Sequence, residues 1–266
     1  EEAAGGKLST ILLIETMAGK GSEIGKTFEE VQKIIELSET TLMFLNVKFD
    51  NSSGINCAGT IDFNGTDQEV TFCKILNDND LNLTCSASST LEINTTDVLH
   101  VDKFNHTNGE LTFNSDVEIY NFVRSSSAGE VIFEDVNFSN SFANASEESI
   151  TFTKGVTFGV PVQINGNTVI NSSENLEITN VIQGAYELTI NASGKKVSLI
   201  DKTSDEDTAV FDIDIGSLVI TCSDLDISAD IKSTGGITFN TAKINAAGNT
   251  LFNSVAGDLT LNSASS

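Results

Sequence analysis

The sequence is poor in several residue types, and each shortage narrows what the protein can be. Its 266 residues include no tryptophan, one proline, two tyrosines and two histidines. A chain with a single proline and 39% apolar residues does not have the composition of a linker or a disordered segment. No run of about 18 apolar residues occurs, so the sequence predicts no membrane-spanning helix and no direct membrane insertion.

Positive charge is also scarce. The chain contains 14 Lys and Arg against 38 Asp and Glu, which gives a formal net charge of −24. Such a chain repels phosphate backbones, so nucleic acid is excluded as a partner, and anionic lipid surfaces are disfavoured. The simplest interpretation of this acidity is that the net negative charge keeps the protein soluble.

The residues that most often bind metals or act in catalysis are few and poorly spaced. The cysteines contain no C-x-x-C pair, which argues against a structural zinc site; they are Cys57, Cys73, Cys85 and Cys222. A disulfide between Cys57 and Cys73 is left open, because it depends on geometry. His100 and His106 do not share a helix face, and we expect both on the surface. The single arginine, Arg124, lies in the turn-like stretch RSSSAG, and we expect it on the surface as well.

A four-residue pattern, apolar–x–apolar–Asn, recurs from about residue 54 onward. In the middle of the chain, segments in register begin at Leu91, Leu111, Val131 and Ile150, at a spacing of 19 to 20 residues. A second series of apolar triplets follows in step, at 117–119, 136–138 and 156–158. Two series in phase indicate a repeat architecture. The pattern itself occurs as IDFN (61–64), LEIN (91–94), LTFN (111–114), VQIN (162–165), LTIN (188–191), ITFN (237–240) and LTLN (259–262).

Each triplet has the period of a β-strand, and Ser, Asn, Gly, Asp and Thr fill the segments between triplets. Strands this short are stable only when successive coils stack on one another. The sequence therefore predicts an all-β fold, a right-handed parallel β-helix with about 20 residues per coil. We expect Asn94 and Asn114 to be neighbours in a ladder, each allowing its strand to turn a corner. An antiparallel sandwich or barrel is the alternative, but Asn-Gly hairpin signals are few.

Near the N-terminus, "ILLIETMAGKGSEIGKTFEEVQKII" (11–35) has the letters of a phosphate-binding loop. Gly25-Lys26-Thr27 follows Gly19 after five residues and Gly21 after three, whereas that loop requires four. We therefore expect no nucleotide site here.

The same stretch contains a better signal for a helix. Thr27-x-x-Glu30 is a capping box, and the apolar residues that follow it recur on one side of a helix over 27–38. Together with a strand over 8–15, this helix would cover the open end of the first coil. The sequence thus predicts an N-terminal cap over 1–53 and β-helix coils over 54–266.

This organisation resembles the right-handed parallel β-helix superfamily, on the evidence of the repeated LTFN and ITFN motifs and the strand and helix before them. That superfamily includes pectate-lyase-like enzymes, phage tailspikes and the passenger segments of bacterial surface adhesins. The resemblance implies a secreted or cell-surface chain. The last coil, DLTLNSASS, has no polar cap, and we expect the chain to be part of a longer protein.

Acidic stretches are the remaining candidates for a site. DKTSDEDTAVFDID (201–214) and NDND (77–80) could supply oxygen ligands, but neither has the spacing of a known calcium loop, so a solvated insertion is the simpler hypothesis. We expect no catalytic residue, no cofactor and no metal, because no nucleophile–base motif occurs.

The sequence therefore favours an adhesin or scaffold that binds host-cell or matrix proteins or glycans through its solenoid surface. The alternatives are a polysaccharide-degrading or tailspike-like enzyme and a purely structural stalk.

Overall fold

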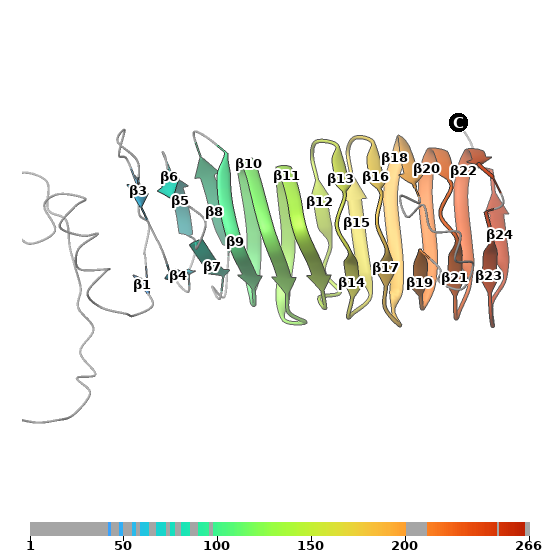
Figure 1. The fold of residues 1–266 in the computed structure, drawn as a ribbon, viewed down its shortest axis with the longest axis horizontal. Coiled ribbons are helices and arrows are strands. Elements are labelled where there is room, and N and C mark those ends of the chain that lie inside the picture. Colours follow the sequence, from blue (N-terminus) through green and yellow to red (C-terminus); the bar gives the residue numbers. More distant parts are fainter. Residues whose placement is uncertain are drawn as a thin grey trace, which may run out of the picture. The chain divides into compact units, whose positions relative to one another are not determined.

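The computed structural model describes residues 42–43, 48–49, 55–56, 59–63, 68–72, 75–77, 81–85, 90–95, 98–200, 212–248 and 250–263. Contacts divide the chain into Glu1–Thr40 and Thr41–Ser266. The predicted strand over 8–15, the capping box of Thr27 and Glu30 and the helix over 27–38 lie outside the described residues. The described part of the second unit is an all-β parallel solenoid of about eight turns with about 20 residues per turn (Figure 1), which confirms the predicted fold class. Its right-handed sense stays a prediction.

The strands form three ladders, in which every pairing between described strands is parallel and joins one coil to another. Six long strands pass round corners and contribute to two or three ladders; they are β9 (Leu99–His106), β10 (Gly109–Arg124), β11 (Ala128–Asn144), β18 (Glu187–Leu199), β20 (Ser217–Ile227) and β22 (Ile237–Ala246).

The remaining strands are short, and chain order assigns each of them to one ladder. Ladder A contains β1 (Leu42–Met43), β4 (Gly59–Phe63), β7 (Leu81–Cys85), β14 (Val162–Ile164), β17 (Ile182–Gln183), β19 (Ile213–Ile215), β21 (Ile231–Ser233) and β23 (Phe252–Ser254). Ladder B contains β2 (Lys48–Phe49), β5 (Gln68–Phe72), β8 (Thr90–Thr95), β12 (Ile150–Phe152), β15 (Thr168–Ser172) and β24 (Leu259–Asn262). Ladder C contains β13 (Val156–Phe158) and β16 (Leu176–Ile178), and the separate pair β3 (Ile55–Asn56) and β6 (Ile75–Asn77) occupies the same place in the chain order.

The register of ladder B agrees with the repeat seen in the sequence. Leu91 pairs with Leu111, Leu111 with Val131, and Val131 with Ile150, which are the four predicted segment starts. The second series of triplets forms ladder C, where Val117 pairs with Val136. The sequence spacing is therefore the strand register itself.

The apolar–x–apolar–Asn motifs, however, do not all belong to one ladder. Five of the seven begin in ladder B, whereas Ile61 and Val162 belong to ladder A, where Ile61 pairs with Leu83 and Val162 pairs with Phe142. Any ladder of this solenoid buries alternate residues of a short strand, so the same pattern can arise in each.

Columns of phenylalanine fill the interior of the coils between residues 99 and 158. Within ladder B, the rings of Phe113 and Phe133 stack at a centroid distance of 5.0 Å, and those of Phe133 and Phe152 stack at 5.6 Å. Phe133 also contacts Phe122 of ladder A and Phe138 of ladder C edge-on, at 5.6 Å each. Stacking along a column and edge contacts between columns are both favourable for aromatic rings, so these residues hold the three ladders around one core. In the next coil smaller residues continue these columns. Ser172 follows Phe152 in ladder B, Ile178 follows Phe158 in ladder C, and Val162 follows Phe142 in ladder A.

One coil is longer than the others. Ile182 pairs with Ile213, 31 residues further along the chain, whereas other pairs in ladder A, such as Val162 and Ile182, lie 20 residues apart. The acidic stretch predicted as an insertion lies in this long coil.

Candidate binding surfaces of the solenoid

Because side chains alternate along a strand, every ladder has an outward row between its buried residues. We call the outward surfaces of ladders A, B and C face A, face B and face C. These surfaces are the candidate sites, since they repeat from coil to coil at the strand spacing of about 4.8 Å.

Faces A and C carry charges of both signs. On face A, Lys232 Nζ lies 2.8 Å from Asp214 Oδ2. On face C, Lys196 Nζ contacts Asp226 Oδ2 at 2.5 Å, and the hydrogen bond from Lys196 lowers the pKa of Asp226. His100 Nδ1 lies 2.9 Å from Glu118 Oε2 on the same face. These exposed pairs offset like charges in neighbouring coils, and each stabilises the fold only slightly.

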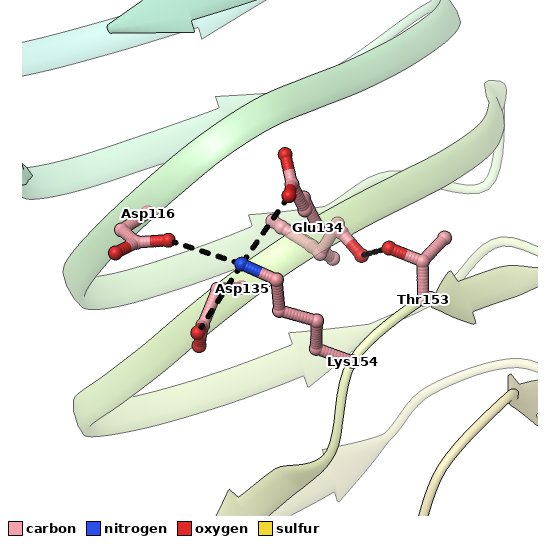
Figure 2. A network of polar contacts seen from close by, with 6 residues as sticks. Asp116, Glu134, Asp135, Thr153 and Lys154 are labelled. Atoms are coloured by element: carbon pink, nitrogen blue, oxygen red, sulfur yellow. Dashed lines mark hydrogen bonds and ion pairs between the residues drawn. The ribbon is translucent and has the colours of Figure 1, made fainter. Parts of the chain in front are cut away.

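A cluster of carboxylates surrounds one lysine at the corner between ladders B and C (Figure 2). Lys154 Nζ lies 3.2 Å from Glu134 Oε1, 3.8 Å from Asp116 Oδ1 and 4.0 Å from Asp135 Oδ2. The hydrogen bond to Glu134, followed by the charges of the carboxylates, raises the pKa of Lys154. Asp116 and Asp135 are register neighbours, so one ammonium offsets the repulsion between stacked carboxylates.

Face B differs from the other two because much of it carries no charge. Over six successive coils, from β12 to β24, two adjacent outward rows carry no charge, and we call these two rows the neutral face. It consists of Thr151, Val169, Asn171, Thr189, Asn191, Val219, Thr221, Thr238, Asn240, Thr260 and Asn262. Carboxylates lie directly beside these rows. Thr189 Oγ1 donates a hydrogen bond to Glu187 Oε1, the outward residue at the start of β18, at 3.2 Å. Thr151 Oγ1 donates to Glu130 Oε1 at 3.2 Å.

Asparagine amides link neighbouring coils of the neutral face. Asn191 Nδ2 donates to Asn171 Oδ1 at 3.1 Å, and Asn262 Nδ2 donates to Asn240 Oδ1 at 2.8 Å. Between these pairs, Asn240 Nδ2 donates to the hydroxyl oxygen of Thr221 at 3.2 Å. These asparagines lie within strands, so they join coils and do not form the corners that we expected. For Asn94 and Asn114 a ladder stays a prediction.

A column of polar residues lies inside the solenoid, which the sequence analysis missed. Cys85, His106, Arg124 and Asn144 are successive register partners in ladder A, and each is at most 1% exposed. The prediction that His106 and Arg124 lie on the surface is therefore wrong, whereas His100 is exposed as expected. The sequence does contain a signal for this column. The pattern Phe-x-polar recurs at nearly the coil spacing, at 104–106, 122–124 and 142–144.

Arg124 joins several backbone segments from within the core. Its guanidinium donates to the carbonyl oxygens of Gly129, Glu148 (2.9 Å) and Ser149 (3.2 Å), and to Asn144 Oδ1 at 3.2 Å. Burial lowers the pKa of Arg124 to about 10, so the side chain is cationic at neutral pH. It supplies donors to carbonyls at the turn where the chain leaves ladder A for ladder B.

His106 is held as a neutral ring. Its Nε2 donates to the carbonyl oxygen of Gly109 at 2.8 Å, and its Nδ1 is buried without a hydrogen-bond partner. Burial, and to a lesser degree the charge of Arg124, lowers the pKa of His106 to about 4.

The described residues of the two acidic stretches do not form a cluster of metal ligands. Asp212 Oδ2 accepts a hydrogen bond from the Asp230 backbone N–H at 2.8 Å, and Asp214 pairs with Lys232. Several residues singled out in the sequence lie outside the described residues: the other acidic residues of 201–214, Asp78 and Asp80 of the NDND stretch, and Cys57 and Cys73. Within the described ranges, no three His, Cys, Asp or Glu side chains come together as metal ligands, and no helix is long and apolar enough to cross a membrane.

Comparisons with known proteins assign no family to the chain. No family model matches it, and no solved structure matches it significantly. A stretch of 29 residues, 11% of the chain, is 66% identical to part of a protein described as probable endonuclease 4 from Methanosphaera stadtmanae. The chain spans about a tenth of the length of that protein.

Proposed function

We propose that the chain is an extracellular or cell-surface adhesin or scaffold, which binds host-cell or matrix proteins or glycans through the outward faces of its solenoid. The observation that carries this proposal is the stacking of three ladders over about eight turns, which presents side chains at a constant repeat on continuous faces. Repeat proteins use such extended surfaces for binding.

The charge of the chain supports the same proposal. A net charge of −24 keeps a long repetitive protein soluble and suppresses nonspecific association with acidic polymers. It also opposes contact with a phosphate backbone, so the short match to a probable endonuclease does not lead us to propose nuclease activity.

Two measurements test the proposal. Antibodies against the chain should label intact cells of the source organism, and the purified chain should bind saturably to a component of a cell-surface and matrix array. Labelling that requires permeabilised cells would contradict surface display. Release of reducing ends from a polysaccharide would favour the enzyme alternative, and a complete absence of binding would favour the stalk.

A further inference from the structure

We infer that the neutral face, Thr151 to Asn262 on ladder B, binds an uncharged, unbranched polysaccharide that lies along the stack of coils. This inference rests on the proposed function, because it names the face and the partner of a surface-binding protein. The first argument is charge. Two adjacent rows of ladder B, eleven residues over six coils, are uncharged on a chain of net charge −24, and the nearest outward charge within these strands is Glu187. Faces A and C carry ion pairs such as Lys232–Asp214 and Lys196–Asp226.

The chemistry of the neutral face matches sugar hydroxyls. Its threonine hydroxyls both donate and accept hydrogen bonds, and each asparagine amide has two N–H donors and one acceptor oxygen. Asn191 and Asn262 use one N–H each to bind the coil before them, so the ladder fixes the amide while a second N–H is left for a ligand. The methyl groups of Thr189, Val219 and Thr238 offer apolar contacts for the C–H faces of a sugar.

Rigidity favours binding by this face. Apart from the asparagines, all its outward residues are valine or threonine, whose branched side chains have few rotamers in a strand. The strands beneath them, from β12 to β22, each pair with a strand on both sides; β20, for example, pairs with β18 and with β22. A polymer would therefore lose little side-chain entropy on binding, which is the usual benefit of a preorganised surface.

The size of the face separates a polysaccharide from a protein partner. Six coils at about 4.8 Å and strands about 15 Å long give an area of roughly 430 Å². A stable protein interface buries about 800 Å² on each partner, so the neutral face alone is too small for a second copy of this chain. A linear polymer needs less area, and each coil adds one more set of contacts to it.

The repeated contacts predict a dependence on polymer length. Binding at one coil is weak, but a chain that contacts several coils gains affinity because the later contacts are intramolecular. Polyanionic polymers should bind worse than neutral ones, since the net charge of −24 repels them.

The test uses the full chain in depletion assays with insoluble cellulose, chitin and mannan, and with polygalacturonate and hyaluronate as charged polymers. We expect retention on at least one neutral polymer, little retention on the charged ones, and competition by long but not by two-sugar fragments. The double substitution Thr189→Lys with Thr238→Lys should reduce retention by about tenfold. The control, Thr157→Lys with Gln183→Lys, makes the same charge change on faces C and A and should stay within about twofold, a difference of about 0.4 kcal/mol.

Thr189→Val with Thr238→Val removes two hydroxyls with little change of shape, so it tests the face if the lysine variant does not fold. A smaller loss of retention is expected for it, and retention equal to that of the native chain would overturn the hydrogen-bonding argument. Equal effects of the two lysine variants, tighter binding to polyanions, or no retention on any neutral polymer would overturn the inference. The proposed function would survive that result if the chain still labelled intact cells and bound a protein of the array.

Discussion

Acidification should destabilise the protein through His106. The ring is fully buried, Nε2 donates to Gly109, and Nδ1 has no partner, so a second proton would place an unsatisfied N–H in the core beside the Arg124 guanidinium. The folded chain therefore prefers the neutral ring, and its pKa falls from 6.5 to about 4. The unfolded chain binds this proton at a higher pH than the folded chain does.

The sign and size of the effect follow from that difference. Above pH 6.5 the ring is neutral in both states and the stabilisation is complete; it is lost as the pH falls from 6.5 towards 4. At about 1.4 kcal/mol per pKa unit, the free energy of unfolding should fall by about 1 kcal/mol at pH 6, about 2 kcal/mol at pH 5 and about 3 kcal/mol at pH 4.

Urea unfolding, followed by far-UV circular dichroism between pH 7 and pH 4, measures this loss. The 38 carboxylates also titrate near the lower end of this range, so the useful quantity is the difference between the native chain and His106→Gln. Glutamine stays neutral and can still donate to Gly109. The exposed His100→Gln variant should keep the pH dependence of the native chain. If the difference between the native chain and His106→Gln stayed constant between pH 7 and pH 4, the reasoning would be refuted.

The remaining predictions concern the core and the ladder. Arg124→Met should lower the free energy of unfolding by about 2–4 kcal/mol in urea titrations, because the carbonyls of Gly129, Glu148 and Ser149 each lose the hydrogen bond from the guanidinium. Lys154→Met, in the exposed cluster, should cause no measurable change, and equal effects of the two variants would contradict this role for Arg124. Phe133→Ala should lower the free energy of unfolding by about 3–5 kcal/mol, clearly more than Phe252→Ala in the partly exposed last turn. A larger drop in melting temperature for Phe252→Ala than for Phe133→Ala would contradict the packing. Thr221→Asn should raise the stability by about 0.5–1 kcal/mol, because it joins Asn191 to Asn240 in one amide ladder; a lower melting temperature would count against the ladder.

The repeat and the register of ladders B and C could be predicted from sequence, because burying alternate residues in stacked coils forces both series to keep one spacing. Leu111, Val131 and Ile150 are register partners for that reason. Ladder A was harder to detect, since its inward pairs in β9, β10 and β11 are Phe-x-His, Phe-x-Arg and Phe-x-Asn. A polar residue at one of two inward positions breaks the apolar alternation, and Arg124 in particular is buried because it finds backbone carbonyls that no sequence pattern reveals.

The candidate surfaces were less predictable than the fold. Packing in the core does not restrict which residue type occupies the outward position of a triplet. Only the strand register therefore shows that Asn191 lies beside Asn171 and Thr221. Once the ladders are known, the uncharged rows of ladder B become visible as one surface.

Distances between spin labels along face B test the stacked, parallel arrangement most directly. In a background in which the four native cysteines are replaced, cysteine pairs for labelling would join Thr112 to Asn191, Thr221 or Asn240, which lie four, five and six coils along one row of ladder B. The stacked coils predict distances of about 19, 24 and 29 Å, rising by about 4.8 Å per coil. Distances that do not rise in this order and by this step would contradict the solenoid.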